Sequence, residues 1–384
     1  MTSMGSCDIL HIVNSLECGG AEHLALETVR ALAARGWRPA LCALGGNRMP
    51  EETSGLRVAE LRARGFSDPL GFARLARLVL KWRPRVIHTH LIWSDLWGCA
   101  AARLARTAIL VSTAHSAVDR RARSAPLRYL CCKAARRRSW TLAISNAVAA
   151  YRAEQGEPLE RMSVLPNAVD VGRFAAGDGL RMRRGWGIPT DLPLIGCVAR
   201  LNPIKGLTVL LRAFAQLRAS RARLVIVGGG PEEAALRALA RSCGAGERVT
   251  FAGALPRREI PDALAAFDAF VLPSLHEGLG IAIIEAMAAG RPVVASRVDG
   301  IPELVRHRET GLLAPPGDAE GLARMLDLLL ARPTFALALG RAAQAEAWRR
   351  FDLSPYVSRL EALYRRLLPE PGALGRRISL GGMP

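Results

Sequence analysis

Short apolar runs alternate along this chain with longer segments in which apolar residues recur at helical spacing. The first run, residues 8–14, precedes a helical pattern over residues 21–35. Further strand-like and helix-like segments follow at residues 39–44, 70–82, 86–89, 93–106 and 109–113. Regular alternation of short apolar strands with amphipathic helices predicts an α/β protein with a doubly wound parallel sheet.

A second series of the same kind begins at residue 194, after a segment rich in Gly, Arg and Asp. A chain of 384 residues can bury two substantial cores. We therefore predict two domains joined by a loose linker, and then a further helix and a disordered tail. The predicted boundaries are 1–171 and 192–352 for the domains, 172–191 for the linker, 353–368 for the helix and 369–384 for the tail.

One stretch combines a strand, a tight glycine turn and a helix. The apolar run 269–272 precedes Gly278 and Gly280, and a helical pattern then continues to Gly290. A helix that begins beside glycines exposes unpaired backbone N–H groups, here those of Ile281 and Ala282, at the positive end of its dipole. This stretch therefore predicts a binding site for phosphate oxygens.

Two carboxylates flank this predicted phosphate site, Glu277 in the turn and Glu285 eight positions later. Phosphates would repel a carboxylate, so each glutamate is predicted to accept hydroxyl hydrogen bonds from neutral sugar parts of the ligand. Sugar on both sides of a diphosphate describes a nucleotide sugar. An ordinary helix with a solvated N-terminal glutamate, favoured by the helix dipole, is the alternative.

The same stretch resembles the EX7E motif of family 4 retaining glycosyltransferases, which have the GT-B fold, and the resemblance covers nearly the whole chain. It implies two Rossmann-like domains that face a cleft, with acceptor in the first and nucleotide sugar in the second. The last helix would cross back onto the first domain. The resemblance places Glu277 near the donor sugar, Glu285 near the ribose, and the N–H groups after Gly280 near the diphosphate.

Glycine turns follow two other strands. Gly19 and Gly20 come after the first strand, where adjacent glycines let the backbone approach a ligand. They resemble the GGxE loop of the family, which is expected near the donor phosphate and sugar. Gly228 follows the apolar run 224–227, and similar turns in the family border the donor nucleotide. In both places a tight turn that leads into a helix is the alternative.

Two cations are predicted to converge on the phosphate site. Arg200 comes just after a strand and Lys205 at the start of the next helix. A departing diphosphate needs compensating charge, and the family resemblance gives both residues this role. Only three of the 53 basic residues are lysines, so Lys205 stands where arginine was the more common choice. Two ordinary surface cations are the alternative.

Three histidines stand at the ends of predicted strands, where open parallel sheets bind ligands. His88 and His90 end one strand and His115 follows the next. His115 resembles the family histidine that approaches the donor sugar from the first domain. We expect His88 and His90 to be satisfied by local backbone hydrogen bonds. No metal site is predicted, because no Asp or Glu accompanies the pair.

The formal charge of +19 suggests anionic partners. Eight basic residues lie between positions 120 and 138, from Arg120 to Arg138, and alternate with apolar residues. Such a helix can lie on an anionic membrane, although a solvated face is the alternative. The sequence carries no nucleic-acid-binding signature, export leader or run of ~18 apolar residues. We therefore expect a cytoplasmic protein, with peripheral contact to the inner face of the plasma membrane as an option.

These observations predict a retaining glycosyltransferase that moves a sugar from a UDP- or GDP-linked donor without an essential divalent metal. The acceptor would be a glycan, a lipid-linked molecule or a small molecule, in envelope or exopolysaccharide synthesis. Arg200, Lys205, Glu277 and His115 are the predicted catalytic residues. Two alternatives stay open: a GT-B sugar-nucleotide epimerase, and a non-catalytic basic binding module.

Overall fold

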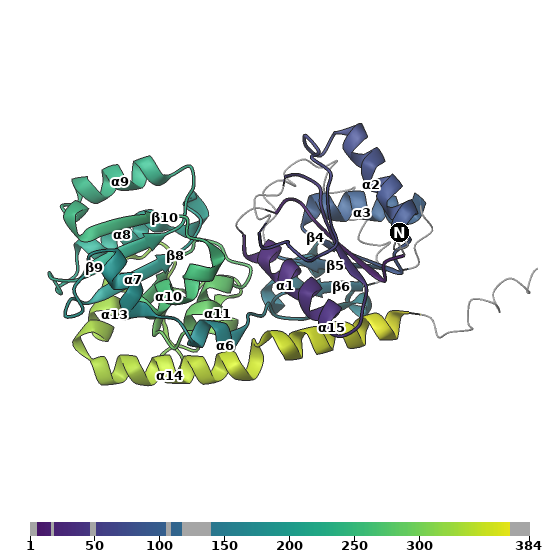
Figure 1. The fold of residues 1–384 in the computed structure, drawn as a ribbon. Helices are drawn as coiled ribbons and strands as arrows, with labels where there is room; N and C mark the ends of the chain where they lie inside the picture. Colours follow the sequence, from purple (N-terminus) through teal and green to yellow (C-terminus); the bar gives the residue numbers. More distant parts are fainter. Residues whose placement is uncertain (1–5, 17–18, 47–50, 105–108, 117–139, 369–384) are drawn as a thin grey trace, which may run out of the picture.

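The computed structural model describes residues 6–16, 19–46, 51–104, 109–116 and 140–368. Two lobes lie side by side in Figure 1, and each contains one parallel sheet covered by helices. The predicted membrane-contacting segment, from Arg120 to Arg138, and the tail 369–384 lie outside the described residues.

The first lobe is built on a sheet of seven described strands in the order β3-β2-β1-β4-β5-β6-β7. Every neighbouring pair is parallel. The strands are β1 (Ile9–Val13), β2 (Pro39–Ala43), β3 (Val58–Glu60), β4 (Val86–His90), β5 (Ile109–Ala114), β6 (Trp140–Ala143) and β7 (Met162–Val164). The sequence pattern missed β3, because this short edge strand is not buried.

The second lobe repeats the arrangement with six described parallel strands in the order β10-β9-β8-β11-β12-β13. These are β8 (Leu194–Val198), β9 (Arg223–Val227), β10 (Val249–Gly253), β11 (Ala269–Leu272), β12 (Val293–Ser296) and β13 (Leu312–Ala314). The prediction of two doubly wound sheets is confirmed. In each sheet the strand order reverses beside the first strand, and ligands bind in the crevice at this point in such folds.

Side-chain hydrogen bonds to free backbone N–H groups help to fix where helices begin. At the start of α2, for example, the Asp68 carboxylate accepts hydrogen bonds from the N–H groups of Leu70 and Gly71, both at 3.0 Å. The longer helices are α1 (Gly20–Ala34), α2 (Pro69–Trp82), α3 (Ile92–Leu104), α5 (Asn146–Glu154), α8 (Leu207–Ala215), α9 (Glu233–Ser242), α11 (Ile281–Ala288), α13 (Ala319–Ala331), α14 (Pro333–Arg350) and α15 (Leu353–Leu367). The shorter ones are α6 (Val171–Ala175), α7 (Gly179–Gly185), α10 (Ile260–Ala266) and α12 (Ile301–Leu304).

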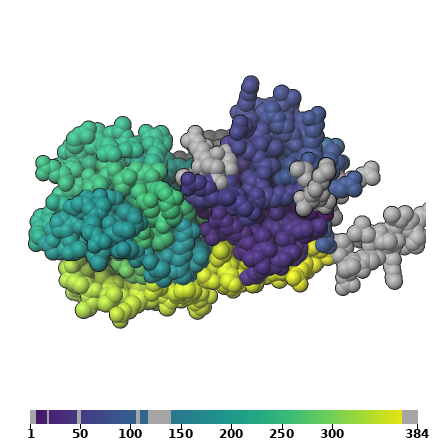
Figure 2. Space-filling view, viewed as in Figure 1, coloured from purple at the N-terminus to yellow at the C-terminus, as the bar shows by residue number. Residues whose placement is uncertain are grey.

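The last two helices connect the lobes. Helix α14 packs on α11 in the second lobe, and α15 continues along the first lobe, so both run along one side of the molecule (Figures 1 and 2). The buried face of α15 joins the core of the first lobe beside α1, β1, β4 and β5. This face consists of Tyr356, Val357, Leu360, Leu363 and Tyr364. The first lobe therefore contains a core element from the far end of the chain.

The segment 172–191 is not the loose linker that its composition suggested. Most of it forms α6 and α7, which pack against α10. Arg183 is buried and donates hydrogen bonds to the Ala266 carbonyl and the Asp268 carboxylate, both at 2.8 Å. A Cβ atom on Gly179 would lie 2.3 Å from the Ala265 carbonyl oxygen. Two of the segment's five glycines, Gly177 and Gly179, therefore serve close packing on α10.

We predict that Gly179→Ala lowers the free energy of unfolding by about 2 kcal/mol, because the added methyl group overlaps the α10 backbone. Gly185→Ala, in the same helix, is the matched control, since a Cβ atom there meets nothing within 4 Å. Urea unfolding of both variants checks the difference. Equal stability of the two variants would show that α7 does not pack closely on α10.

Candidate functional site

The turn between β11 and α11 has the geometry of an anion site. Gly280 adopts φ 98°, a left-handed conformation that favours glycine, and α11 begins at the next residue. The N–H of Ile283 already bonds to the Gly280 carbonyl at 3.0 Å. The N–H groups of Ile281 and Ala282 precede any intrahelical acceptor and point out from the positive end of the helix. An anion placed before α11 can therefore accept both hydrogen bonds.

Lys205 and Glu277 meet beside this turn. Lys205 ends a 3-10 turn that follows β8, and the Ile204 carbonyl accepts a hydrogen bond from the N–H of Leu275 at 2.7 Å. This bond ties the two loops together, so that the Lys205 Nζ atom lies 2.5 Å from Glu277 Oε2. Ser274 also donates to Glu277 Oε2, at 3.2 Å. Two residues 72 positions apart thus form one partly exposed charged pair.

Arg200 differs from Lys205 because its side chain has no partner. The Arg200 carbonyl accepts a hydrogen bond from the N–H of Asn202 at 2.9 Å, but its exposed guanidinium makes no hydrogen bond or ion pair within the described part of the chain. The neighbouring turn is held by Gly228, whose φ is 135° and whose Cβ atom would lie 1.9 Å from the Ala199 carbonyl oxygen. Contact with the β8 loop therefore explains the glycine here, and contact with a donor nucleotide stays a prediction.

Glu285 lies one turn into α11 and is buried. Its carboxylate forms an ion pair with Arg257, which precedes α10. The Arg257 guanidinium also lies 5.0 Å from the centroid of the Phe174 ring. The sequence did not identify Arg257, because nothing in its local pattern separates it from the many other arginines. Contact of Glu285 with a ribose stays a prediction. A ribose at this position would meet a carboxylate that is already paired with Arg257.

Two loops of the first lobe contact the glycine turn and helix of the second. A Cβ atom on Gly20 would lie 2.8 Å from the Ile281 side chain, and a Cβ atom on Gly278 would lie 2.4 Å from the His115 carbonyl oxygen. Gly19, with extended backbone, immediately precedes α1. The structure thus brings Gly19, Gly20 and His115 to the predicted phosphate site. Glycine is needed at position 278, where a side chain would overlap the backbone of the first lobe, whereas a side chain at position 20 would displace the end of Ile281.

Hydrogen bonds join the lobes at the same place. Ser145, which caps the N-terminus of α5, donates to the Gly278 carbonyl at 2.7 Å. The Glu303 carboxylate of the second lobe accepts from the backbone N–H groups of Asn146 at 2.8 Å and Ala147 at 2.9 Å. A carboxylate at a helix N-terminus is favoured by the free N–H groups and the dipole. Nothing in the sequence around Glu303 indicated this contact.

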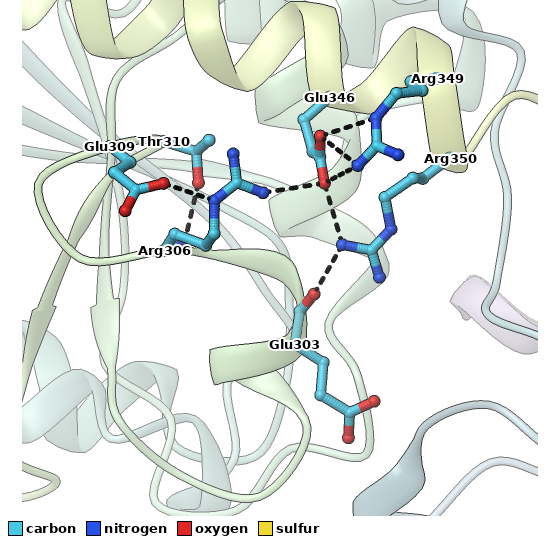
Figure 3. Close-up of polar contacts among 7 residues, drawn as sticks. All are labelled: Glu303, Arg306, Glu309, Thr310, Glu346, Arg349 and Arg350. Carbon is cyan, nitrogen blue, oxygen red and sulfur yellow. Dashed lines mark hydrogen bonds and ion pairs between the residues drawn. The ribbon is translucent and has the colours of Figure 1, made fainter.

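Three arginines surround Glu346, and one of them also reaches the helix that carries Glu303. Glu346, near the end of α14, is buried and accepts hydrogen bonds from Arg306, Arg349 and Arg350, and Arg350 also donates to the Glu303 carbonyl at 3.2 Å (Figure 3). Burial opposes ionisation of Glu346, but hydrogen bonds from Arg349 and Arg350 lower its pKa below the usual value. The Glu303 carboxylate points away from this group in Figure 3.

The histidines form a buried group. His115 is partly exposed, and its Nε2 atom lies 3.2 Å from His90 Nδ1. The expectation that local backbone bonds satisfy His88 and His90 was wrong, because their rings bond to side chains of other elements. His11 of β1 and Tyr364 of α15 belong to the same group and were missed, since strand pairing and the returning helix bring them there. Ligand atoms of His11, His88 and His90 lie within 4.8 Å of one another.

Burial keeps these rings neutral. It lowers the pKa of His11 to about 3 and that of His115 to about 4, while the charge of nearby Asp95 acts in the opposite direction on His115. Burial also lowers the pKa values of His88 and His90 well below the ordinary range, and the other rings of the group act in the same direction.

We predict that stability falls as the pH is lowered from 7 to 5. An unfolded histidine binds a proton near pH 6.5, whereas these rings stay neutral in the native state until the pH approaches 4. Their stabilisation is thus complete above the unfolded pKa and is lost toward the folded pKa, at up to about 1.4 kcal/mol per ring per pH unit. Urea unfolding across this window measures the slope. Resonances of His11, His88, His90 or His115 that titrate near pH 6.5 in the native state would contradict it.

Two parallel sheets whose loops meet around an open helix N-terminus, flanked by cations and acids, define a protein of the GT-B class. Residues 18–173 match the family model Glycosyltransferase Family 4, and residues 180–346 match the model Glycosyl transferases group 1. The chain belongs to glycosyltransferase family 4.

Two relatives illustrate the likeness. A 2-deoxystreptamine glucosyltransferase of Streptomyces kanamyceticus is 33% identical over 313 residues, which cover 76% of this chain and 80% of that protein. A GDP-mannose-dependent alpha-(1-6)-phosphatidylinositol monomannoside mannosyltransferase of Mycobacterium tuberculosis is 38% identical over 198 residues, or 48% of this chain and 51% of that protein. The matched region thus spans about half the length of the mannosyltransferase.

The fold also matches solved structures. The crystal structure of Anabaena Alr3699/HepE in complex with UDP and glucose aligns with a TM-score of 0.85 over 94% of this chain and 100% of that chain, at 24% identity. A likeness at this identity shows the shared fold. Within the described residues, no helix has the length and apolar character needed to cross a membrane.

Proposed function

We propose that this protein is a retaining glycosyltransferase that moves a sugar from a nucleoside diphosphate sugar to a hydroxyl group of an acceptor. The observation that carries the proposal is the meeting of Lys205, Glu277 and the open N-terminus of α11 at the seam between the two lobes. Cations and N–H groups suit a diphosphate, while a carboxylate suits sugar hydroxyl groups.

In the proposed reaction, the bond between the anomeric carbon and the diphosphate oxygen breaks as the acceptor oxygen attacks from the same face. The acceptor proton passes to the departing phosphate oxygen, and negative charge grows on the diphosphate. Lys205, the unpartnered Arg200 and the N–H groups of Ile281 and Ala282 stabilise this charge. Glu277 already binds Lys205 and Ser274, and the neighbouring Asp299 carboxylate accepts the Glu277 N–H at 2.9 Å. Because both acids are engaged in holding the turn, we favour same-face attack over double displacement.

The ion pair between Lys205 and Glu277 explains how the site is held before donor binding. Each side chain offsets the charge of the other, so neither is left alone in a partly buried position. When a donor binds, the Lys205 ammonium turns to the diphosphate, and Glu277 accepts hydrogen bonds from the sugar. His115 approaches the same sugar from the first lobe, since its carbonyl lies against Gly278.

The names of the relatives guide the choice of substrates. One relative is described as GDP-mannose-dependent, and one solved structure of the same fold contains UDP and glucose, so we propose a GDP- or UDP-linked hexose as donor. Named acceptors are a glycolipid and an aminocyclitol. We propose a glycan, lipid-linked or small-molecule acceptor, bound mainly by the first lobe, with membrane contact through the segment that runs from Arg120 to Arg138.

We predict that Lys205→Ala and Glu277→Gln each lower turnover at least 100-fold, the typical cost of losing one charge-stabilising contact in a transition state. Lys81→Ala, at an exposed lysine of α2, and Glu320→Gln, at a 77% exposed carboxylate, are matched controls and should keep full activity. Thermal shift with UDP and GDP first selects the nucleotide, and release of that nucleotide from its sugar is then measured with acceptor. Full turnover in either site variant would contradict the assignment.

We also predict that EDTA leaves turnover unchanged, because Arg200, Lys205 and the α11 N-terminus supply the compensating charge. Assays with and without acceptor test the remaining alternatives at the same time. Release of nucleotide that requires acceptor supports transfer, whereas free isomerised sugar formed from the donor alone would identify an epimerase. Loss of activity in EDTA that magnesium restores would overturn the metal-free mechanism.

A further inference from the structure

The core of the first lobe becomes polar toward the site. On the sheet face covered by α15, one row of paired residues is Ile9, Val86 and Ile109, and all three are apolar. Two residues further along the strands, the same face carries His11 and His88, and then His90 and Thr113. All four polar side chains are buried. Burying so many polar groups is costly unless each has a hydrogen-bond partner.

The partners form one chain of hydrogen bonds that ends at His115. His90 Nδ1 lies 3.2 Å from His115 Nε2, and His90 Nε2 lies 3.1 Å from His11 Nδ1. The Tyr364 hydroxyl lies 3.5 Å from His11 Nε2 and 2.5 Å from His88 Nδ1. His88 Nε2 lies 2.7 Å from the Thr113 hydroxyl. Both nitrogens of each of the three buried rings are therefore used, and the chain runs from β5 through α15 to the seam between the lobes.

Ring geometry favours hydrogen bonds over a metal ion here. The rings of His88 and His90 stack with centroids 4.5 Å apart and planes 18° apart, and His11 and His90 are also stacked. The lone pairs of imidazole nitrogens lie in the ring planes, so stacked rings do not aim them at one common point. The His11 Nδ1 and His90 Nε2 atoms lie 3.1 Å apart, which is the distance of a hydrogen bond between a protonated and a bare ring nitrogen.

Because the rings are neutral, the hydrogen bonds that connect them have a fixed order from donor to acceptor. A neutral imidazole has one N–H and one bare nitrogen, so the direction of one bond determines that of every other. The phenol hydroxyl is the strongest donor in the chain, and its short contact is with His88, which places its proton on that side. His11 then donates to the Tyr364 oxygen, His90 donates to His11, and His115 donates to His90. This order leaves His115 Nδ1 without a proton.

We propose that Tyr364, together with His11, His88 and His90, positions His115 by holding its ring as the Nε2–H tautomer, so that Nδ1 can accept a hydrogen bond from a donor-sugar hydroxyl. The sugar contact rests on the proposed function. The tautomer does not, because it follows from the hydrogen-bond chain alone. Tyr364 lies on α15, so the helix that returns from the second lobe would set the chemistry of a site residue in the first.

Nitrogen-15 NMR of the histidine side chains tests the tautomer without any substrate, and the chain has seven histidines, so the spectrum is simple. The His115 signals are identified by their loss in His115→Asn. We expect one tautomer in the wild-type protein, with Nε2 protonated. Tyr364→Phe removes the hydroxyl but keeps the ring, and should convert His115 to a mixture of tautomers.

Tyr356→Phe is the matched control, because Tyr356 is also a buried tyrosine of α15 and its hydroxyl bonds to Thr28 instead of the histidines. We expect similar losses of thermal stability in both variants, but a change at His115 only in Tyr364→Phe. With a nucleotide sugar that turns over, Tyr364→Phe should lower kcat roughly five- to tenfold, the effect of one hydrogen bond, while Tyr356→Phe keeps it.

The two proposals can fail separately. A tautomer mixture at His115 in the wild-type protein, or an unchanged His115 signal in Tyr364→Phe, would overturn the positioning role whether or not the protein transfers sugar. Should Tyr364→Phe fail to fold, the wild-type spectrum alone decides. If His115 has a single Nε2–H tautomer but no nucleotide sugar is turned over, the positioning role of the hydrogen-bond chain would be supported and the proposed function contradicted.

Discussion

The turn at Gly278–Gly280 has to satisfy two demands at once, and the rest of the site depends on it. It must leave the first N–H groups of α11 without protein acceptors, and it must touch the first lobe through the Gly278 carbonyl, which accepts a hydrogen bond from Ser145. A side chain at Gly278 would overlap the His115 carbonyl. The open helix end and the closed contact between the lobes are thus built from the same few residues.

Charge is used in two ways in this arginine-rich protein. Many arginines hold buried or partly buried acids: Arg257 pairs with Glu285, and three arginines hold Glu346. These pairs have structural roles, because an acid left without its cation at such sites would be costly. Arg200 and Lys205 differ, since the Arg200 side chain has no partner within the described ranges and the Lys205 pair is partly open to solvent. Net charge alone could not separate the two uses.

Apolar side chains also join the two lobes by packing across the seam. Ile144 and Val148 of the first lobe belong to the same hydrophobic cluster as the core of the second, and α15 completes the core of the first. The segment 172–191 resembles a flexible linker in composition, but its Gly177 and Gly179 instead let it pack closely on α10. The seam between the lobes is therefore a continuation of both cores.

The sequence by itself determined the two sheets, the glycine turn before α11 and the residues around it, because apolar periodicity and turn chemistry act over a few neighbouring positions. It also placed His115 just after a strand, Glu277 in a turn that follows a strand, and Lys205 at the start of a following helix, and parallel sheets bring such segments to one edge. Only the tertiary structure decided that Lys205 pairs with Glu277, that Glu303 holds α5, and that Tyr364 reaches His11 and His88. These contacts join residues 72 to 353 positions apart, and no local pattern records which distant side chains the packing of whole elements will bring together.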